Sequence, residues 1–195
     1  MLPPIAGIFD KKKLLRERMK LERDHAAAAR PDAAVHAARN FMSAIDIADG
    51  DVVSLYDPMR NELDPRPLAE ALLEKGAIIA LPVVRRKKAP LIFRKFTPRD
   101  TLIDGAYGEQ IPDETAPEIT PDIVLAPMLA FSKGGGRLGY GGGFYDRTLV
   151  QLRADGNVIA VGYAYGAQEV DDLPLSPLDQ PLDWVVTERG AFRCV

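Results

Sequence analysis

The chain has 195 residues, of which 47% are hydrophobic and 27% are charged. This composition is typical of a soluble globular protein and argues against a disordered chain, and the length suits one domain with a sizeable core. The net charge of −3 argues against a general binder of nucleic acid or of anionic membranes. Because Cys194 is the only cysteine, the sequence excludes an intrachain disulfide and a multi-cysteine zinc site.

Two further features bear on where the protein resides. No stretch of the sequence reaches the ~20 apolar residues that a membrane helix needs. The N-terminal residues place an apolar segment before a basic one, which is the reverse of a secretory signal. We therefore expect a cytoplasmic protein. We also expect no nucleic-acid or membrane partner, and a monomer is the favoured oligomeric state.

The first part of the chain predicts two helices. Residues 11–30 are charged and rich in Leu and Ala, which predicts a basic N-terminal helix packed on the domain. Residues 32–45 predict a second helix, in which Asp32 follows Pro31 and serves as the N-cap. Four apolar residues recur along it at helical spacing: Val35, Ala38, Met42 and Ile45.

Six short strand-like runs follow, and several are continuously apolar rather than alternating. AIIALPVV, DIVLAPMLAF and NVIAVGYA are the clearest of them. Continuous apolar runs are typical of strands buried on both faces, as in a parallel sheet that helices cover. The six runs are residues 51–56, 77–84, 91–96, 122–131, 157–164 and 183–187.

Two more helices alternate with these strands. Residues 67–75 and 145–155 predict helices that end at Gly76 and Gly156, a position that glycine favours. Residues 97–121 contain several prolines and are expected to form a long surface excursion. Strands that alternate with helices predict a layered α/β fold, here in one domain over residues 1–195.

A glycine-rich segment, residues 134–143, lies between a buried strand and a helix and holds seven of the sixteen glycines. A loop of this kind lets backbone N–H groups approach an anion such as phosphate. Lys133 and Arg137 are cations suited to phosphate oxygens, and the rings of Tyr140, Phe144 and Tyr145 suit a flat ligand. A flexible loop with no ligand is the alternative.

The standard phosphate-binding motifs do not account for this segment. Residues 134–139 formally match G-x-G-x-x-G, but the helix begins after Gly143 and no acidic residue ends the next strand. A P-loop is excluded because the chain has no Lys-Ser or Lys-Thr pair.

Few other residues are candidates for chemistry. His25 and His36 lie in Ala-rich helical stretches and are expected at the surface, so the sequence offers no Ser-His-Asp or Cys-His arrangement and no histidine metal motif. Asp146 begins the last helix, where it either offsets the helix dipole or binds Mg²⁺ beside a phosphate. Asp179 precedes the last strand and is equally open to a role in a turn.

The segment GGGRLGYGGGFYDR resembles the 5-formyltetrahydrofolate cyclo-ligase family, also called 5,10-methenyltetrahydrofolate synthetases. Other pieces of the chain fit the same family in order, from about Lys11 to Glu188. They are KKKLLR, YDPMRNELDPRPL, IALPVV and LPLSPLDQPLDWVVTE.

The resemblance implies a three-layer α/β/α single domain with a mostly parallel central sheet. It also implies an enzyme that uses ATP and Mg²⁺ to convert 5-formyltetrahydrofolate to 5,10-methenyltetrahydrofolate, with release of ADP and phosphate. In the family's route the formyl oxygen accepts the γ-phosphoryl group, which gives an iminium phosphate before the ring closes. The partner is therefore a reduced folate, with or without a polyglutamate tail.

The resemblance also assigns site residues by position. Arg137 is the catalytic candidate and Asp146 and Asp179 are the magnesium candidates, while Asp57 and Glu62 bind the folate together with Tyr140 and Phe144. The ATP-binding candidates are Lys12, Arg16, Arg137, Leu138, Gly139, Tyr140, Gly141, Gly142, Gly143, Phe144 and Tyr145.

Three positions depart from the family's pattern. Some members carry Lys where this chain has Gly142, so a phosphate contact there comes from elsewhere. Leu178 replaces a His that many members have before the final Asp. Phe144 replaces the commoner Tyr, which removes a hydroxyl and keeps the ring.

Two alternatives from other classes stay open on the sequence alone. One is a non-catalytic relative that binds nucleotide or folate, which the presence of Glu62, Arg137 and Asp146 argues against. The other is an enzyme of similar architecture that handles a sugar phosphate or CoA. The lack of a catalytic His or Cys agrees with phosphoryl transfer, which depends on positioning and on neutralising phosphate charge.

Overall fold

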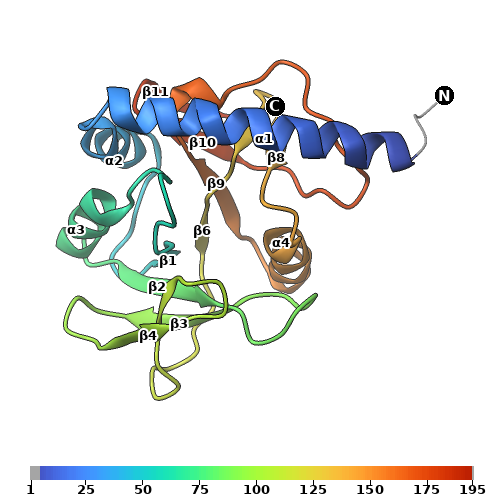
Figure 1. The fold of residues 1–195 in the computed structure, drawn as a ribbon. Helices are drawn as coiled ribbons and strands as arrows, with labels where there is room; N and C mark the ends of the chain where they lie inside the picture. Colours follow the sequence, from blue (N-terminus) through green and yellow to red (C-terminus); the bar gives the residue numbers. More distant parts are fainter. Residues whose placement is uncertain (1–4, 195) are drawn as a thin grey trace.

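The computed structural model describes residues 5–194. Seven strands form its central sheet: β1 (Val52–Ser54), β2 (Ile78–Val83), β3 (Ile92–Phe96), β6 (Ile123–Ala126), β9 (Ile159–Tyr163), β10 (Trp184–Thr187) and β11 (Gly190–Arg193). Their order is β11-β10-β9-β6-β1-β2-β3 (Figure 1). Neighbours from β10 to β2 are parallel, while β11 and β3 pair antiparallel at the edges. The mostly parallel sheet is thus confirmed.

The strands at the centre of the sheet are buried on both faces, as their continuous apolar sequences predict. Every residue of β1 and β6 is buried. Three helices supply the cover: α2 (Ala33–Ala44), α3 (Arg66–Glu74) and α4 (Phe144–Asp155). Helices α2 and α3 lie on one face of the sheet and α4 lies on the other (Figure 1). The three-layer α/β/α architecture is confirmed.

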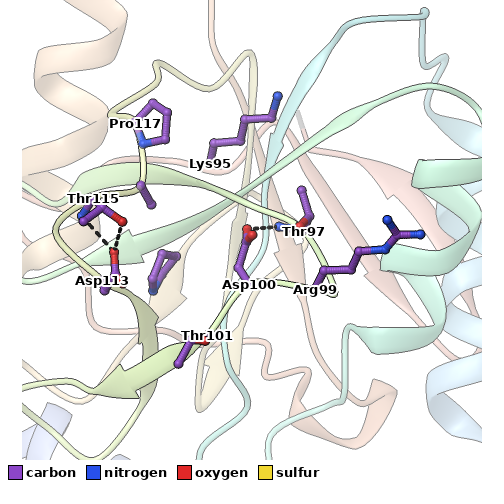
Figure 2. Close-up of a pocket in the computed structure, with 10 residues that line it drawn as sticks. Lys95, Thr97, Arg99, Asp100, Thr101, Asp113, Thr115 and Pro117 are labelled. Carbon is purple, nitrogen blue, oxygen red and sulfur yellow. Dashed lines mark hydrogen bonds between the residues drawn. The ribbon is translucent and has the colours of Figure 1, made fainter.

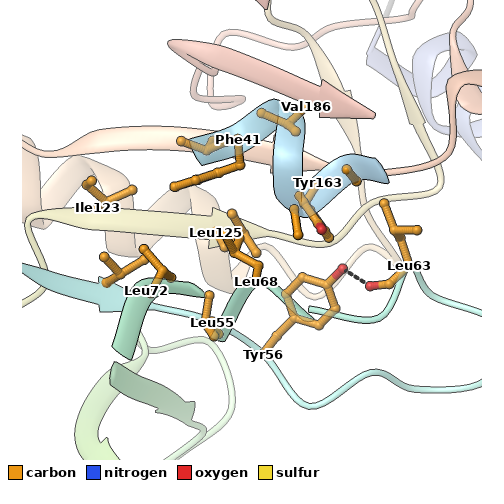
Figure 3. Close-up of a cluster of buried hydrophobic side chains, with 14 of the residues drawn as sticks. Phe41, Leu55, Tyr56, Leu63, Leu68, Leu72, Ile123, Leu125, Tyr163 and Val186 are labelled. Atoms are coloured by element: carbon orange, nitrogen blue, oxygen red, sulfur yellow. Dashed lines mark hydrogen bonds between the residues drawn. The ribbon is translucent and has the colours of Figure 1, made fainter. Parts of the chain in front are cut away.

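The largest of the three core clusters lies between the sheet and helices α2 and α3. Figure 3 shows Phe41 of α2 and Leu72 of α3 on the side of the sheet that carries Leu125 and Tyr163. The opposite cluster packs Leu149 of α4 against the other face. Helix α1 (Ile5–Ala29) is a separate element that runs across one end of the molecule and contacts η1 (Gly166–Gln168), just beyond β9 (Figure 1).

The chain order places a topological switch point between β1 and β6. From β1 the chain passes through α3 to β2 on one side, whereas from β6 it passes through α4 to β9 on the other. The segments that leave β1 and β6 therefore diverge to opposite faces of the sheet. In open α/β sheets, ligands bind outside the carboxyl ends of the strands at such a point.

Two small hairpins lie outside the central sheet. Strands β4 (Leu102–Asp104) and β5 (Gln110–Pro112) form one of them, inside the stretch that the sequence analysis treats as a surface excursion. Strands β7 (Ala130–Phe131) and β8 (Arg137–Leu138) form the other. The prediction of one continuous glycine loop is therefore wrong, because β8 divides the glycine-rich segment into two turns.

Several predicted boundaries are also corrected. Helix α1 begins at Ile5 rather than near residue 11, and β11 has no counterpart among the predicted strands. Asp32 does precede α2, but its side chain does not cap the helix. Its backbone is helical (φ −94°, ψ 0°) rather than extended as a capping residue requires, and its carboxylate lies 3.1 Å from His36 Nε2.

The expectation that both histidines lie at the surface is confirmed. His25 and His36 are both exposed. Burial, with the charge of Asp183, raises the pKa of the half-buried Cys194 thiol to about 11, so the thiol is protonated and a poor nucleophile near neutral pH. Within residues 5–194, no helix is long and apolar enough to cross a membrane.

The two glycines that follow α3 and α4 allow a matched test of the fold. Gly76 has φ +84°, and a Cβ there would lie 2.0 Å from Asp49 Oδ1. Gly156 has φ 174°, which any residue adopts, and a Cβ there would meet no atom within 4 Å. Gly76→Ala should lower the free energy of unfolding in urea by about 1–2 kcal/mol, and Gly156→Ala should not lower it. Equal losses in both variants would contradict this assignment.

Candidate functional site

The candidate site lies where the segments after β1 and β6 meet helix α1. The segment after β1 carries Asp57 and Glu62, and the segment after β6 carries the β7–β8 hairpin and residues 139–143. Helix α1 presents one face to these segments. Its buried positions follow helical spacing: Lys12, Met19, Arg23 and Ala26. Three segments distant in sequence thus converge at the switch point.

Arg137 is the most buried cation of the glycine-rich segment. Its Nη2 donates to Asp146 Oδ1 at 2.6 Å, and its Nη1 donates to the carbonyl of Gln180. The same Asp146 oxygen accepts the backbone N–H of Gln180 at 3.0 Å. Burial lowers the pKa of Arg137, and the charges of Asp146 and Asp179 oppose that effect. The ion pair fixes the start of α4 against β8 and against the segment after η1.

Asp179 pairs with helix α1. Its Oδ2 accepts Lys12 Nζ at 2.5 Å and the backbone N–H of Ser176 at 2.6 Å. Lys12 is 7% exposed, although it is a lysine on an outer helix. One turn further along α1, Arg16 Nε donates to the carbonyl of Gly139 at 2.8 Å. Burial lowers the pKa of Arg16, while the charge of Asp179 raises it. The structure therefore brings Lys12, Arg16 and Asp179 together with the glycine-rich segment.

The two predicted magnesium ligands are brought close to each other, because Asp146 binds the backbone of the residue that follows Asp179. Each uses a single carboxylate oxygen in its hydrogen bonds within residues 5–194, Oδ1 in Asp146 and Oδ2 in Asp179. The described part of the chain contains no cluster of three or more acidic, His or Cys side chains that could hold a metal alone. Two carboxylates suit Mg²⁺ only if phosphates and waters complete its shell.

Arg147 supports the second glycine turn and was missed by the sequence analysis. Its Nη2 donates to the carbonyl of Gly142 at 2.6 Å, and its guanidinium carbon lies 5.4 Å from the centre of the Phe144 ring. Gly141 (φ +99°) and Gly143 (φ +65°) have backbone conformations that favour glycine. A Cβ at Gly142 would lie 2.8 Å from the Phe144 ring, so the Lys found there in some family members would require that ring to move.

A second residue missed from sequence, Arg23, lies at the centre of a buried polar cluster. Its Nη2 donates to the Tyr140 hydroxyl at 2.6 Å, and its Nη1 lies 3.5 Å from Glu62 Oε1. Glu62 Oε2 accepts the backbone N–H of Met59 at 2.9 Å. Burial raises the pKa of Glu62, and the Met59 N–H and the charge of Arg23 oppose that rise. A signal existed in the sequence, because Arg23 lies on the helical face of Lys12 and Arg16.

The β4–β5 hairpin reaches the remaining predicted residues. Asp57 Oδ2 accepts the backbone N–H of Gln110 at 2.9 Å. The rings of Tyr107 and Phe144 meet edge to face, with centroids 5.7 Å apart. Asp57 and Phe144 therefore lie on one border of the site, which the hairpin closes.

Two of the predicted ATP-binding residues, Leu138 and Tyr145, differ in exposure. Leu138 is 2% exposed and belongs to an apolar cluster with Met19 of α1. Tyr145 is half-buried, and burial together with the charge of Glu62 raises the pKa of its phenol, so it stays neutral.

A pocket of about 420 Å³ lies apart from this site, between the end of β3 and the β4–β5 hairpin (Figure 2). No predicted site residue lines it. Both carboxylates that line it make hydrogen bonds within local turns. Asp100 accepts the backbone N–H of Thr97, and Asp113 accepts the backbone N–H and the hydroxyl of Thr115.

Comparisons with known proteins identify the family of this chain. A family model described as the 5-formyltetrahydrofolate cyclo-ligase family matches residues 8–188. The chain belongs to this family. It is 36% identical over 163 residues to a 5-formyltetrahydrofolate cyclo-ligase of Mycolicibacterium smegmatis, covering 78% of this chain and 81% of that protein. It is 35% identical over 162 residues to one from Escherichia coli K12, covering 80% and 88%.

Solved structures of this family share the fold. The 5,10-methenyltetrahydrofolate synthetase of Aquifex aeolicus superposes with a TM-score of 0.74 at 28% identity, over 93% of this chain and 92% of that one. The synthetase of Mycoplasma pneumoniae gives a TM-score of 0.68 at 22% identity, over 91% and 98%, and shows the likeness of fold alone. The family predicted from sequence is confirmed.

The Arg137–Asp146 pair predicts a stability effect that the helix position of Asp146 does not. Asp146→Asn leaves a buried guanidinium facing an amide, so urea unfolding should show a loss of about 1.5–3 kcal/mol. Asp155→Asn, at the exposed end of the same helix, should change stability by no more than about 0.5 kcal/mol. Equal stabilities of the two variants would show that the pair contributes nothing to folding.

Proposed function

We propose that this protein uses ATP and Mg²⁺ to convert 5-formyltetrahydrofolate to 5,10-methenyltetrahydrofolate, with release of ADP and phosphate. One observation carries the proposal: the switch point of a cyclo-ligase fold gathers three buried or half-buried cations, two aspartates and the glycine-rich segment. The cations are Lys12, Arg16 and Arg137. The same border of the sheet carries Glu62 and Asp57, whose carboxylates suit the N–H groups of a pterin.

The proposed ATP site lies between helix α1 and residues 139–143. Lys12 and Arg16 approach this segment from α1, and Arg137 approaches from β8. Charge-assisted hydrogen bonds from these groups would neutralise phosphate oxygens, and glycine at 139, 141, 142 and 143 leaves the backbone N–H groups uncovered. Arg147 holds the turn by its bond to the Gly142 carbonyl.

Asp146 and Asp179 are the residues that would hold Mg²⁺, each through the carboxylate oxygen that makes no hydrogen bond within residues 5–194. When bound, Mg²⁺ supplies charge that neutralises the phosphates as the phosphoryl group moves. Arg137 and Lys12 fix the two carboxylates in orientation by binding their other oxygens.

The chemistry requires a phosphoryl transfer and a ring closure. The oxygen of the N5-formyl group attacks the γ-phosphorus of ATP, so that an O–P bond forms. The bond between the γ-phosphorus and the β,γ-bridging oxygen breaks, and ADP leaves. The resulting iminium phosphate is attacked at its carbon by the lone pair of N10. The C–O bond then breaks, phosphate leaves, and N10 loses its proton to water. These steps need positioning and charge neutralisation rather than a nucleophilic side chain, which agrees with the residues present.

The folate side of the proposed site is formed by Glu62, Asp57, Tyr140 and Phe144. Tyr140 is 39% exposed and belongs to the glycine-rich segment, so its ring lies between the folate side and the ATP side. Phe144 and Tyr107 supply apolar surface beside Asp57 on the β4–β5 side. This arrangement would bring the N5-formyl group of the folate next to the γ-phosphate of ATP, beside residues 139–143.

A direct assay tests the proposed function. Purified protein mixed with 5-formyltetrahydrofolate, ATP and Mg²⁺ should produce the methenyl chromophore together with equimolar ADP and phosphate. Omission of ATP, or excess EDTA, should abolish the signal. Product formation without ATP hydrolysis, full activity in EDTA, or no product under any of these conditions would contradict the proposal.

A further inference from the structure

The buried cluster around Arg23 connects the three segments that form the site. Arg23 comes from α1, Glu62 from the segment after β1, and Tyr140 from the glycine-rich segment. The side chain of Arg23 is 1% exposed and that of Glu62 is 3% exposed. On the outer side, the guanidinium carbon of Arg60 lies 5.9 Å from the Tyr140 ring centre, so two cations flank that ring.

This cluster is incompletely hydrogen-bonded. Arg23 Nε and Nη1 and Glu62 Oε1 are buried and have no hydrogen-bond partner within residues 5–194. The 3.5 Å separation of Nη1 and Oε1 makes an ion pair without a hydrogen bond. A buried charge pair of this kind is poor evidence for a stabilising role, because desolvation offsets the attraction between the charges. The burial of these charges is therefore better explained by the two side chains that Arg23 contacts, Glu62 and Tyr140.

We propose that Arg23 is a positioning residue for folate binding, which orients Glu62 and Tyr140 together and so links the segment after β1 to the glycine-rich segment. The inference rests on the function proposed above. Arg23 itself touches neither substrate in this arrangement, because it is enclosed by the residues it orients.

The shape of the arginine side chain suits this role. Its planar fork sends Nη2 to the Tyr140 hydroxyl while Nη1 faces Glu62. A lysine carries one compact ammonium group and cannot reproduce both directions. Arg23→Lys should therefore keep a positive charge near Glu62 but lose the orientation of Tyr140.

Arg23 also favours the ionised form of Glu62. Burial raises the pKa of Glu62, and the positive charge of Arg23 lowers it. The other titratable groups that influence Glu62 or are influenced by it come from three elements: Tyr56, Asp57, Tyr140 and Tyr145. Of these, Asp57 raises the pKa of Glu62, and the phenols have raised pKa values and stay neutral. Removal of Arg23 should thus shift the pKa of Glu62 upward.

The test compares Arg23→Met, Arg23→Lys and Glu62→Gln with Arg18→Met. Arg18 is an exposed cation on the same helix and lies outside the site. Arg23→Met should raise the KM for folate about tenfold or more and change the KM for ATP by less than about threefold. Its folate kcat/KM should fall, on acidification, at a higher pH than in the wild type. Arg18→Met should match the wild type in all three readouts.

Two further variants separate the effect of Arg23 on the orientation of Tyr140 from its effect on the charge of Glu62. Arg23→Lys should keep the acid limb of the wild type but retain much of the rise in folate KM. In a Glu62→Gln background, Arg23→Met should cause no shift of the acid limb, because the titrating group is gone. An unchanged folate KM in Arg23→Met, an equal rise of both KM values, or an unmoved acid limb would overturn the proposal. If Arg23→Met does not fold, the folate KM of Arg23→Lys decides: a wild-type value overturns the proposal.

A readout that needs no activity separates this inference from the proposed function. Failure of the wild type to make methenyltetrahydrofolate would refute the function alone. Urea unfolding of the single and double variants at Arg23 and Glu62 would still report their link. Each single variant should raise the unfolding constant by some factor. In the double variant, the rise should be at least about tenfold smaller than the product of the two single-variant factors. Strictly additive effects would overturn the link.

Discussion

The ion pair between Arg137 and Asp146 joins the parts on which the candidate site depends. Arg137 lies in β8 and Asp146 in the first turn of α4, and both also bind the backbone of Gln180. The guanidinium is buried, and the charges of Asp146 and Asp179 compensate its own. The contact brings Asp179 next to Asp146, under the face of α1 where Lys12 lies. Sheet, helix and loop are thereby held in one arrangement.

Charge then decides how α1 contributes. The helix covers little of the main core and instead presents Lys12, Arg16 and Arg23 to three different targets: a carboxylate, a carbonyl, and a hydroxyl beside a carboxylate. Lys12 and Arg23 are more buried than is usual for their residue types. Burial of cations around a glycine-rich segment is costly in the free protein and favourable when an anion enters. This is the physical reason for proposing that the site binds a nucleotide.

The sequence allowed prediction of the fold wherever burial leaves a recognisable pattern of apolar residues, either a continuous run or a helical spacing. Continuous apolar runs predicted β1, β2, β6 and β9, and helical spacing predicted α2, but the half-exposed three-residue strand β4 and the short strand β8 carry no such pattern. In the site, Lys12, Arg16 and Asp146 were predicted from the resemblance to the family, and their roles stay predictions. Arg147 was missed because its role depends on the Gly142 carbonyl and the Phe144 ring, and a cation in the first helical turn is otherwise unfavourable. Arg23 was missed although its helical phase matches that of Lys12.

We propose that nucleotide and folate meet at the glycine-rich segment under α1. A crystal structure of the protein with a non-hydrolysable ATP analogue, Mg²⁺ and 5-formyltetrahydrofolate tests it most directly. We expect phosphates between Lys12 and Arg16 on one side and residues 139–143 on the other, with Mg²⁺ on Asp146 and Asp179 and the pterin beside Glu62. A nucleotide bound in the pocket between β3 and the β4–β5 hairpin, with α1 and the glycine-rich segment free of ligand, would contradict it.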